Sequence, residues 1–342
     1  MTVNKILLAS GTALMLSVGA ASAQDRTLTI SVYGFAQDAY KEILYDPFEA
    51  KCGCKLVVET GNSVERLAKI EANRDNPVID MAVVSATDAL AAARAGLTEK
   101  IDPAKLSNFD LLYDKARDPN GDGMSIGYTF YASSIAYRSD KIDITSWGDL
   151  LSDDLAGRVA LPNVTTTQGP STLYMLGKAM GDEAPDLKAP IAAVGEHKDD
   201  IVTFYVRSSQ LVQLMQQEEI WAAPIGRFAW SGFSKMDMPI KWATPKEGQA
   251  GGMNVMILTK DGKNQDLALE FMDYWLSTEI QTALAENLVD SPANMEVTVA
   301  PDIAENLTIG KETVEGLNII PAALELDNRE TWLSEWNTKV AQ

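Results

Sequence analysis

Short apolar runs alternate with amphipathic stretches between residues 28 and 95, and this order restricts the fold more than any other feature of the chain. The apolar runs predict buried strands, and the stretches between them place apolar residues at helical spacing. Strands that alternate with helices form a mostly parallel sheet covered by helices, which is an α/β fold. The predicted order is strand 28–33, helix 38–50, strand 55–59, helix 63–73, strand 79–84 and helix 87–95.

The middle of the chain repeats this order with interruptions. Two short strands are predicted at 127–131 and 134–137, and further strands at 158–162, 201–204 and 220–224 are separated by helical stretches. Two such α/β units, with the chain crossing between them more than once, form two lobes around a hinged cleft. Because ligands of open α/β sheets bind beyond the carboxyl ends of the strands, we expect the ligand contacts directly after predicted strands.

A strand, a turn and a long amphipathic helix follow at 245–281. The strand is the apolar run 253–259, and Gly251 and Gly252 before it predict a flexible entry. Asn264 is a predicted N-cap, because the residues after it place apolar side chains on one helical face. The segment therefore predicts a strand that returns to the earlier sheet, together with the helix that covers it.

The first 23 residues have the parts of a secretory signal peptide. Lys5 supplies the positive charge, residues 6–20 are mostly apolar, and Ala21-Ser22-Ala23 is a small-residue cleavage site. The apolar run is too short to span a bilayer, and no cysteine stands at the cleavage point to carry a lipid anchor. We therefore predict a free periplasmic protein whose mature chain begins near Gln24.

The chain is acidic, with a formal net charge of −19 at pH 7, which argues against binding to nucleic acids and to anionic membranes. His197 is the only histidine, so a histidine-based zinc site and a Ser-His-Asp triad are disfavoured. We expect no metal and no other cofactor. Cys52 and Cys54 flank one glycine, and the sequence leaves open whether a tight turn at Gly53 lets them form a disulfide.

Three stretches carry a family resemblance: 118–127 (DPNGDGMSIG), 136–161 (AYRSDKIDITSWGDLLSDDLAGRVAL) and 245–281. Through them the chain resembles the spermidine/putrescine-type solute-binding proteins of ABC importers. The resemblance implies a type II periplasmic binding protein, which closes two lobes around a small ligand by hinge bending and delivers it to a membrane permease. We expect a monomer without catalytic residues. The predicted division is a signal peptide at 1–23, lobe I at 24–128 plus 255–320, lobe II at 129–254 and a C-terminal helical segment at 321–342.

The predicted site departs from the polyamine pattern. Polyamine-binding members commonly carry a Trp and, two residues later, an Asp in the loop that enters the late strand. The matching positions here are Gly252 and Asn254, so the aromatic plate and the anionic partner are missing from them. Arg207 and Arg227 each follow a predicted strand, where strand ends face the cleft. A guanidinium suits a carboxylate, sulfonate or phosphonate and repels a diamine.

The remaining candidates also follow predicted strands. Tyr33 ends the first strand and matches a contact position that the resemblance implies. Ser85 and Thr87 lie at a predicted helix N-terminus, which favours anions, and Thr166 lies in a run of three threonines. Trp230 lies close to the second arginine in the sequence and can pack against an alkyl or ammonium group.

These observations predict a transport receptor for a small amine that also bears an acidic group, such as the ω-amino acid 4-aminobutyrate. The alternative within the same fold is a receptor for spermidine or putrescine. A chemoreceptor-coupled sensor would use the same binding fold and differ only in its partner. The alternative from another class is a secreted hydrolase or lyase, for which the sequence offers neither a nucleophile elbow nor a metal cluster.

Overall fold

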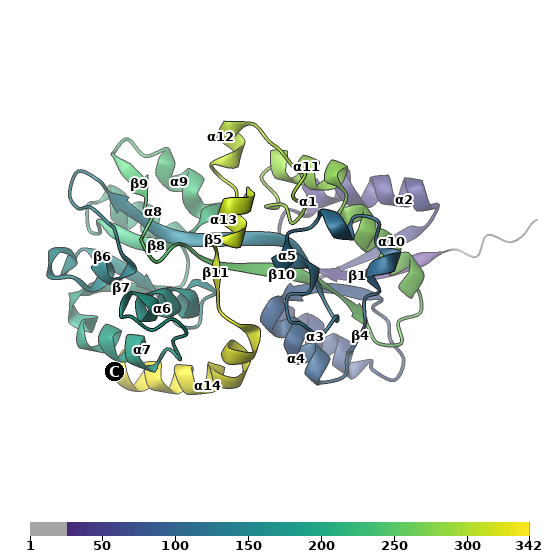
Figure 1. Cartoon of the computed structure of the whole chain (residues 1–342), viewed down its shortest axis with the longest axis horizontal. Coiled ribbons are helices and arrows are strands. Elements are labelled where there is room, and N and C mark those ends of the chain that lie inside the picture. Colours follow the sequence, from purple (N-terminus) through teal and green to yellow (C-terminus); the bar gives the residue numbers. More distant parts are fainter. Residues whose placement is uncertain (1–25, 342) are drawn as a thin grey trace, which may run out of the picture.

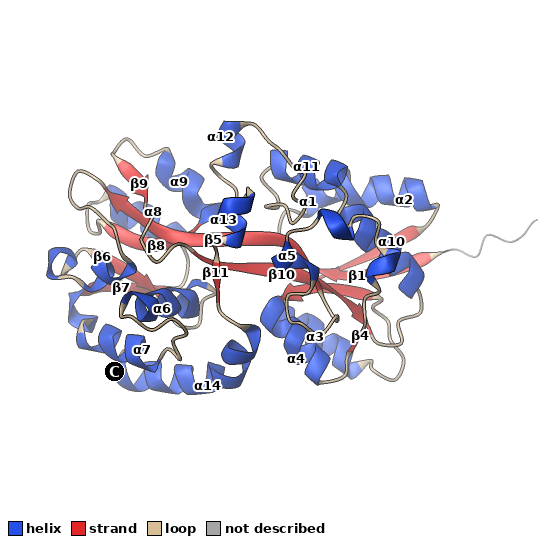
Figure 2. Ribbon diagram, viewed as in Figure 1, coloured by secondary structure: helices blue, strands red, loops and turns tan. Residues whose placement is uncertain are grey.

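The computed structural model describes residues 26–341, and the predicted α/β fold is confirmed (Figure 1; Figure 2). The strands form one continuous sheet in the order β2-β1-β3-β10-β5-β8-β6-β7, with β4 and β11 beside β10 and β9 beside β5. The strands are β1 (Thr27–Val32), β2 (Lys55–Thr60), β3 (Met81–Ser85), β4 (Thr98–Glu99), β5 (Ile126–Arg138), β6 (Val159–Pro162), β7 (Ile201–Tyr205), β8 (Ala222–Gly226), β9 (Ile240–Trp242), β10 (Ala250–Thr259) and β11 (Asn318–Ile319).

Helices flank this sheet in both halves of the molecule (Figure 2). The α-helices are α1 (Gln37–Tyr40), α2 (Asp46–Cys52), α3 (Ser63–Ala72), α4 (Ala86–Arg94), α5 (Asp114–Arg117), α6 (Gln168–Ala179), α7 (Lys188–Glu196), α8 (Ser209–Gln216), α9 (Trp230–Ser234), α10 (Gln265–Trp275), α11 (Thr278–Glu286), α12 (Pro301–Ala304), α13 (Lys311–Glu315) and α14 (Ala322–Lys339). A π-helical turn, η1 (Lys41–Tyr45), joins α1 to α2. Single 3₁₀ turns are η2 (Pro103–Lys105), η3 (Phe109–Leu111), η4 (Trp147–Leu151), η5 (Asp153–Leu155), η6 (Lys198–Asp200) and η7 (Arg227–Ala229).

Each lobe combines parallel strands with one antiparallel neighbour. In lobe I, β1 pairs in parallel with β2 and β3. In lobe II, β6 pairs in parallel with β7 and β8. β10 runs antiparallel to β3, and β5 runs antiparallel to β8. This is the two-lobed type II arrangement that the sequence predicts.

The strands β5 and β10 run side by side from one lobe to the other (Figure 1). β5 is a single strand of 13 residues, so the prediction of two short strands at 127–131 and 134–137 is wrong. The serines that suggest a break are buried and paired, because Ser133 lies opposite Ala250 of β10 on one side and Gly226 of β8 on the other. The predicted lobe boundaries at 128 and 254 fall within these two strands, and their exact place stays a prediction.

The two lobes have separate hydrophobic cores. The lobe I core includes Phe48 and Phe271, whose rings meet edge to face at 4.9 Å between centroids. The main lobe II core includes Trp147, and helix α14 adds Trp332 and Trp336 to it. The first turns of α14 also contact α4 of lobe I, as the lower part of Figure 1 shows. The C-terminal helix therefore packs against both lobes.

One local prediction about the late segment is wrong, and another holds only for the position of the residue. Gly251 and Gly252 lie inside β10, because both are paired with β5. Asn264 is the N-cap residue of α10, as predicted, but its side chain forms no capping hydrogen bond. Instead, its backbone N–H and its side-chain amide both donate to the carboxylate of Asp80, at 3.0 and 3.3 Å.

The predicted signal peptide, residues 1–23, lies outside the described residues. Within residues 26–341, no helix combines the length and the apolarity needed to cross a membrane. The same part of the chain has no group of three or more His, Cys, Asp or Glu side chains that could hold a metal ion. Cys52 and Cys54 form a disulfide with their Cα atoms 5.2 Å apart. Gly53 between them adopts the left-handed conformation, with φ at 59°.

Candidate ligand cleft

A cleft of about 1500 Å³ lies where the strand ends of the two lobes face each other. Its lobe I wall is formed by the residues after β1, the starts of α3 and α4, and residues 288–291. Its lobe II wall is formed by residues 164–168 and 227–228. Residues 128–131 of β5 and 251–254 of β10 lie at its base, and part of α14 lies along one side. The cleft is therefore placed beyond the strand ends, as the α/β topology predicts.

Tyr33 lines the lobe I wall and is held in a polar network. Its hydroxyl lies 3.0 Å from the Ser63 hydroxyl and donates to Asn254 Oδ1 at 3.3 Å. The Arg66 guanidinium stacks on its ring at 4.0 Å from the centroid and also donates to Ser63 Oγ at 3.2 Å. Burial raises the pKa of Tyr33 above its usual value. The side chain is therefore a neutral, fixed hydrogen-bonding group at the cleft surface.

Ser85, Thr87 and Thr166 also line the cleft, but their hydroxyls have partners within the protein. Ser85 Oγ caps α4 by accepting from the Asp88 backbone N–H at 3.1 Å. The Thr87 hydroxyl donates to Glu325 of α14 at 2.7 Å. The Thr166 hydroxyl donates to the Asn163 carbonyl at 2.8 Å. We expected Ser85 and Thr87 to donate to an anion of the ligand. This arrangement does not favour that role, because the Thr87 hydroxyl already donates to the Glu325 carboxylate.

Arg227 lines the lobe II wall of the same cleft. Its guanidinium lies 4.4 Å from the ring centroid of Trp242 and 5.9 Å from that of Trp230. Partial burial lowers the pKa of Arg227, and the more distant charge of Glu305 partly offsets this effect. Among the described residues, Arg227 forms no ion pair. Trp230 itself is 9% exposed and belongs to the lobe II core. Trp230 does not line the cleft in this arrangement, and its ring lies beside the arginine; a contact of Trp230 with the ligand stays a prediction.

Arg207 does not line the cleft. It borders a shallower hollow that shares only Gln168, Val206 and Phe228 with the cleft. Val206, the residue directly after β7, does line the cleft, whereas Arg207 is exposed and lines the neighbouring hollow with Ser208 and Ser209. A position after a strand therefore indicates the correct edge of the sheet, but not whether the side chain faces the cleft.

The space at Gly252 is filled by an aromatic ring from the neighbouring strand. A Cβ atom at Gly252 would lie 2.3 Å from the Tyr131 ring, and the two residues are opposite each other in the β5–β10 pair. Tyr131 and Asn254 both line the cleft. Tyr131 therefore places an aromatic ring at the cleft surface beside position 252, which itself carries no aromatic side chain.

Asp290 lines the lobe I side of the cleft and was not among the predicted residues. Its side chain is buried, and the Tyr40 hydroxyl donates to Oδ2 at 2.8 Å. Burial raises the pKa of this carboxyl to about 7, against hydrogen bonds that lower it. The available signal in the sequence was one acid within the otherwise uncharged run Leu288–Met295.

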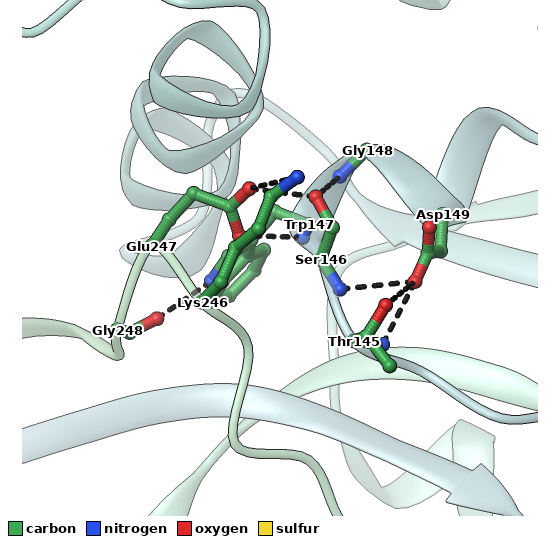
Figure 3. Close-up of polar contacts among 8 residues, drawn as sticks. All are labelled: Thr145, Ser146, Trp147, Gly148, Asp149, Lys246, Glu247 and Gly248. Atoms are coloured by element: carbon green, nitrogen blue, oxygen red, sulfur yellow. Dashed lines mark hydrogen bonds and ion pairs between the residues drawn. The ribbon is translucent and has the colours of Figure 1, made fainter.

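Residues 145–149, which belong to the central stretch of the family resemblance, hold the loop before β10 in place (Figure 3). Glu247 accepts hydrogen bonds from the Ser146 hydroxyl at 2.6 Å and from the Trp147 backbone N–H at 3.1 Å. The Trp147 indole donates to the Gly248 carbonyl at 2.9 Å, and Asp149 completes a capping box with Ser146. Two stretches about a hundred residues apart in the chain therefore fix each other, and the contacts of the cleft come from β10 and not from this loop.

The description "bacterial extracellular solute-binding protein" belongs to the family model that matches residues 44–310. The chain belongs to this family. The spermidine/putrescine-binding periplasmic protein of Escherichia coli is 26% identical over 318 residues, which cover 89% of this chain and 88% of that protein. A solved ABC transporter structure from Clostridium perfringens is 30% identical, with a TM-score of 0.85 over 92% of this chain and 99% of that one. The Atu4243 GABA receptor is 20% identical and shares the fold, with a TM-score of 0.75 over 93% and 98% of the two chains.

This solute-binding protein is the substrate-binding subunit of an ABC importer, as the sequence predicts. Its role is to bind a small ligand and to deliver it to a membrane permease. The curated relatives are named as periplasmic binding proteins. The family therefore defines the class of function, and the side chains of the cleft decide the ligand.

Proposed function

We propose that this solute-binding protein captures a zwitterionic ω-amino acid, such as 4-aminobutyrate, in the periplasm and delivers it to its importer. The observation that carries the proposal is Arg227, a partly buried guanidinium that lines the cleft and forms no ion pair among the described residues. A buried cation without an acidic partner is costly, and a ligand carboxylate would supply that partner.

The surroundings of Arg227 support this role. The guanidinium stacks on Trp242 and lies near Trp230, which leaves its N–H groups free to approach a planar anion. Trp230 is buried and Trp242 is partly buried, so the aromatic support is fixed before the ligand arrives. A fixed donor loses little side-chain entropy when it binds.

Exposed apolar side chains support closure of the lobes around the ligand. Val64, Phe228, Phe35 and Val206 are the most exposed large apolar side chains of the described residues, at 70%, 67%, 65% and 57%. All of them line the cleft. Apolar surface gathered in one place marks a site that becomes covered, and hinge closure would bring lobe I and lobe II side chains together.

The second candidate is a receptor for spermidine or putrescine. The E. coli relative carries this function in its name, and Asp88 and Glu325 line the cleft as potential partners for an ammonium group. Both acids already face a cation, because Arg329 lies 3.8 Å from Asp88 and 3.1 Å from Glu325. A plain diamine would also leave Arg227 without a partner, so this ligand is the less favoured of the two.

Calorimetry with 4-aminobutyrate and putrescine tests the proposal. A hydrogen bond to a charged group contributes about 1.5–3 kcal/mol, so Arg227→Ala is expected to weaken 4-aminobutyrate binding by roughly 10- to 150-fold. Arg207→Ala is the matched control, because it removes an exposed arginine that lies outside the cleft. Tight putrescine binding that is unaffected by Arg227→Ala would overturn the proposal.

The proposal includes a monomer that releases its ligand unchanged. Native mass spectrometry of the protein purified from its host would identify a retained ligand and the oligomeric state together. Conversion of a bound ligand into a product would instead support the hydrolase or lyase alternative.

A further inference from the structure

Among the carboxyl groups that line the cleft in the described residues, Asp290 is the one that is buried, and aromatic side chains lie around it. Tyr40 and Trp275 meet edge to face at 5.4 Å between ring centroids, and Tyr128 lies 4.7 Å from Trp275. All three rings are buried and all three line the cleft together with Asp290. The pocket is therefore a recess of the cleft with an acid at its end and aromatic faces around it.

Among the described residues, no cation forms an ion pair with Asp290. The neutral Tyr40 hydroxyl donates to its carboxylate at 2.8 Å, and the uncharged side chains of Thr129 and Trp275 also lie close enough to lower its pKa. A buried carboxylate normally has a cationic partner, because isolated burial of a charge is costly. Burial without such a partner raises the pKa of this carboxyl to about 7.

Two further buried polar atoms lie beside this recess. The indole Nε1 of Trp275 and the hydroxyl of Tyr45 are buried and form no hydrogen bond of good geometry, although Trp275 lies near the Asp290 carboxyl and Gln37 near the Tyr45 hydroxyl. Buried polar atoms without partners are rare in folded proteins and call for a local explanation. Both side chains lie near Asp290: Trp275 lowers the pKa of the Asp290 carboxyl, and the charge of Asp290 raises the pKa of Tyr45.

We propose that Asp290 binds the ammonium group of the ligand, with Tyr40, Tyr128 and Trp275 packing around the ammonium and the adjacent methylene groups. The inference rests on the proposed function for the identity of the other end of the ligand, which Arg227 binds. Ammonium groups are attracted to aromatic faces as well as to carboxylates, and the attraction increases when water is excluded. The recess thus discriminates against ligands that have a carboxylate and no amine.

Binding then includes the transfer of a proton. The Asp290 carboxyl loses its proton to solvent as the ammonium arrives, and the ligand keeps all of its own protons. The groups that face Asp290 are Tyr40 from α1, Tyr45 from η1, Tyr128 and Thr129 from β5, and Trp275 from α10. Burial raises the pKa of each of these tyrosines, so none of them titrates near neutral pH.

The test is calorimetry of the full-length mature protein with 4-aminobutyrate, putrescine and butyrate across the range from about pH 5 to about pH 8. Wild-type affinity for the two amines is expected to fall about tenfold per pH unit below about pH 7, with proton release measured by comparing buffers of different ionisation enthalpy. Asp290→Asn is expected to weaken amine binding about a hundredfold and to abolish the pH dependence, while butyrate binding stays unchanged. Asp80→Asn is the control, because Asp80 is a buried acid of lobe I that does not line the cleft.

The outcomes separate this inference from the proposed function. If 4-aminobutyrate binding depends on Arg227 and neither on Asp290 nor on pH, the inference is wrong and the proposed function stands. If putrescine binds tightly with Asp290 and pH dependence but without Arg227 dependence, the inference stands and the zwitterionic ligand is wrong. If neither amine binds the wild-type protein, both are wrong. The wild-type pH profile and proton release decide the question even if Asp290→Asn does not fold.

Discussion

The lobe I wall of the cleft carries a network of hydrogen-bonded polar groups beside the exposed Val64 and Phe35, whereas the lobe II wall carries one arginine beside the exposed Phe228 and Val206. On the lobe I side, Tyr33 and Asn254 are hydrogen-bonded to each other and Asp290 is enclosed by rings. On the lobe II side, Arg227 forms no ion pair among the described residues, and Phe228 beside it is 67% exposed. The polar groups of the lobe I wall are therefore positioned before the ligand arrives. The lobe II wall gains its missing contacts only when the ligand binds and the lobes close.

The two walls also differ in charge. Lobe I offers an acid without a cation, and lobe II offers a cation without an acid. A ligand with a positive and a negative end would satisfy both, and would orient itself by doing so.

The largest expected effect comes from making both walls acidic. Arg227→Glu removes the cation and adds repulsion, so affinity for 4-aminobutyrate is expected to fall by about a thousandfold or more, which corresponds to about 4 kcal/mol. Putrescine affinity is expected to rise, because both ends of the diamine would then face carboxylates. Competition calorimetry measures the switch, and Arg207→Glu serves as the control. A variant that binds both ligands as the wild type does would show that the charge difference between the walls is irrelevant.

Removal of the buried acid is expected to change stability as well as binding. The pKa of Asp290 is raised to about 7 in the folded protein, so its contribution to stability is fully present below the unfolded-state pKa of about 3.9 and is lost as the pH rises through about 7. Without ligand, Asp290→Asn is expected to be more stable than the wild type by up to about 4 kcal/mol near pH 8, and equally stable near pH 4. Urea unfolding at the two pH values measures this difference, and a gain that does not change with pH would contradict the explanation.

The base of the cleft is expected to tolerate no side chain at position 252. A Cβ atom there would lie 2.3 Å from the Tyr131 ring of the paired strand β5. Gly252→Ala is therefore expected to destabilise the protein by about 1–3 kcal/mol in urea unfolding. Gly34→Ala is the matched control, because the nearest atom to its added Cβ is at 3.8 Å. Equal costs at the two glycines would show that Tyr131 moves freely and does not form a fixed aromatic plate.

The smallest expected effect concerns the exposed apolar side chains of lobe II. Phe228→Ala is expected to leave the stability of the free protein within about 0.5 kcal/mol, since the ring is solvated. Its ligand affinity is expected to fall by roughly three- to tenfold, because closure would bury the ring. Met180→Ala is the control, as this side chain is 56% exposed and does not line the cleft. If the two variants bind the ligand equally well, closure does not bury Phe228.

The predictions from sequence succeed where local patterns decide the structure. The helix predicted at 63–73 is α3, which begins at Ser63 behind a capping box formed by Asn62 and Glu65. The order of strands and helices, and the position of the cleft beyond the strand ends, follow from periodicity and topology. Tyr33, Arg227 and Asn254 line the cleft for this reason.

The predictions fail where a distant part of the chain decides the outcome. Asn264 is the N-cap residue of α10, but its side chain binds Asp80, 184 residues away, and forms no capping hydrogen bond. Trp230 packs into the lobe II core, and Arg207 lines the neighbouring hollow, so neither lines the cleft. Asp290 becomes a candidate only because α1, β5 and α10 enclose it.

The sequence by itself determined the α/β class, the two-lobed family and the expectation of an arginine at a strand end. These properties depend on local patterning, which each stretch of chain carries independently. Only the tertiary structure decided which strand ends are near the centre of the sheet, that Tyr131 fills the space beside Gly252, and that Asp290 is buried without a cation. These properties depend on packing and on the loss of water around a charge, and both arise only when residues far apart in the chain are brought together.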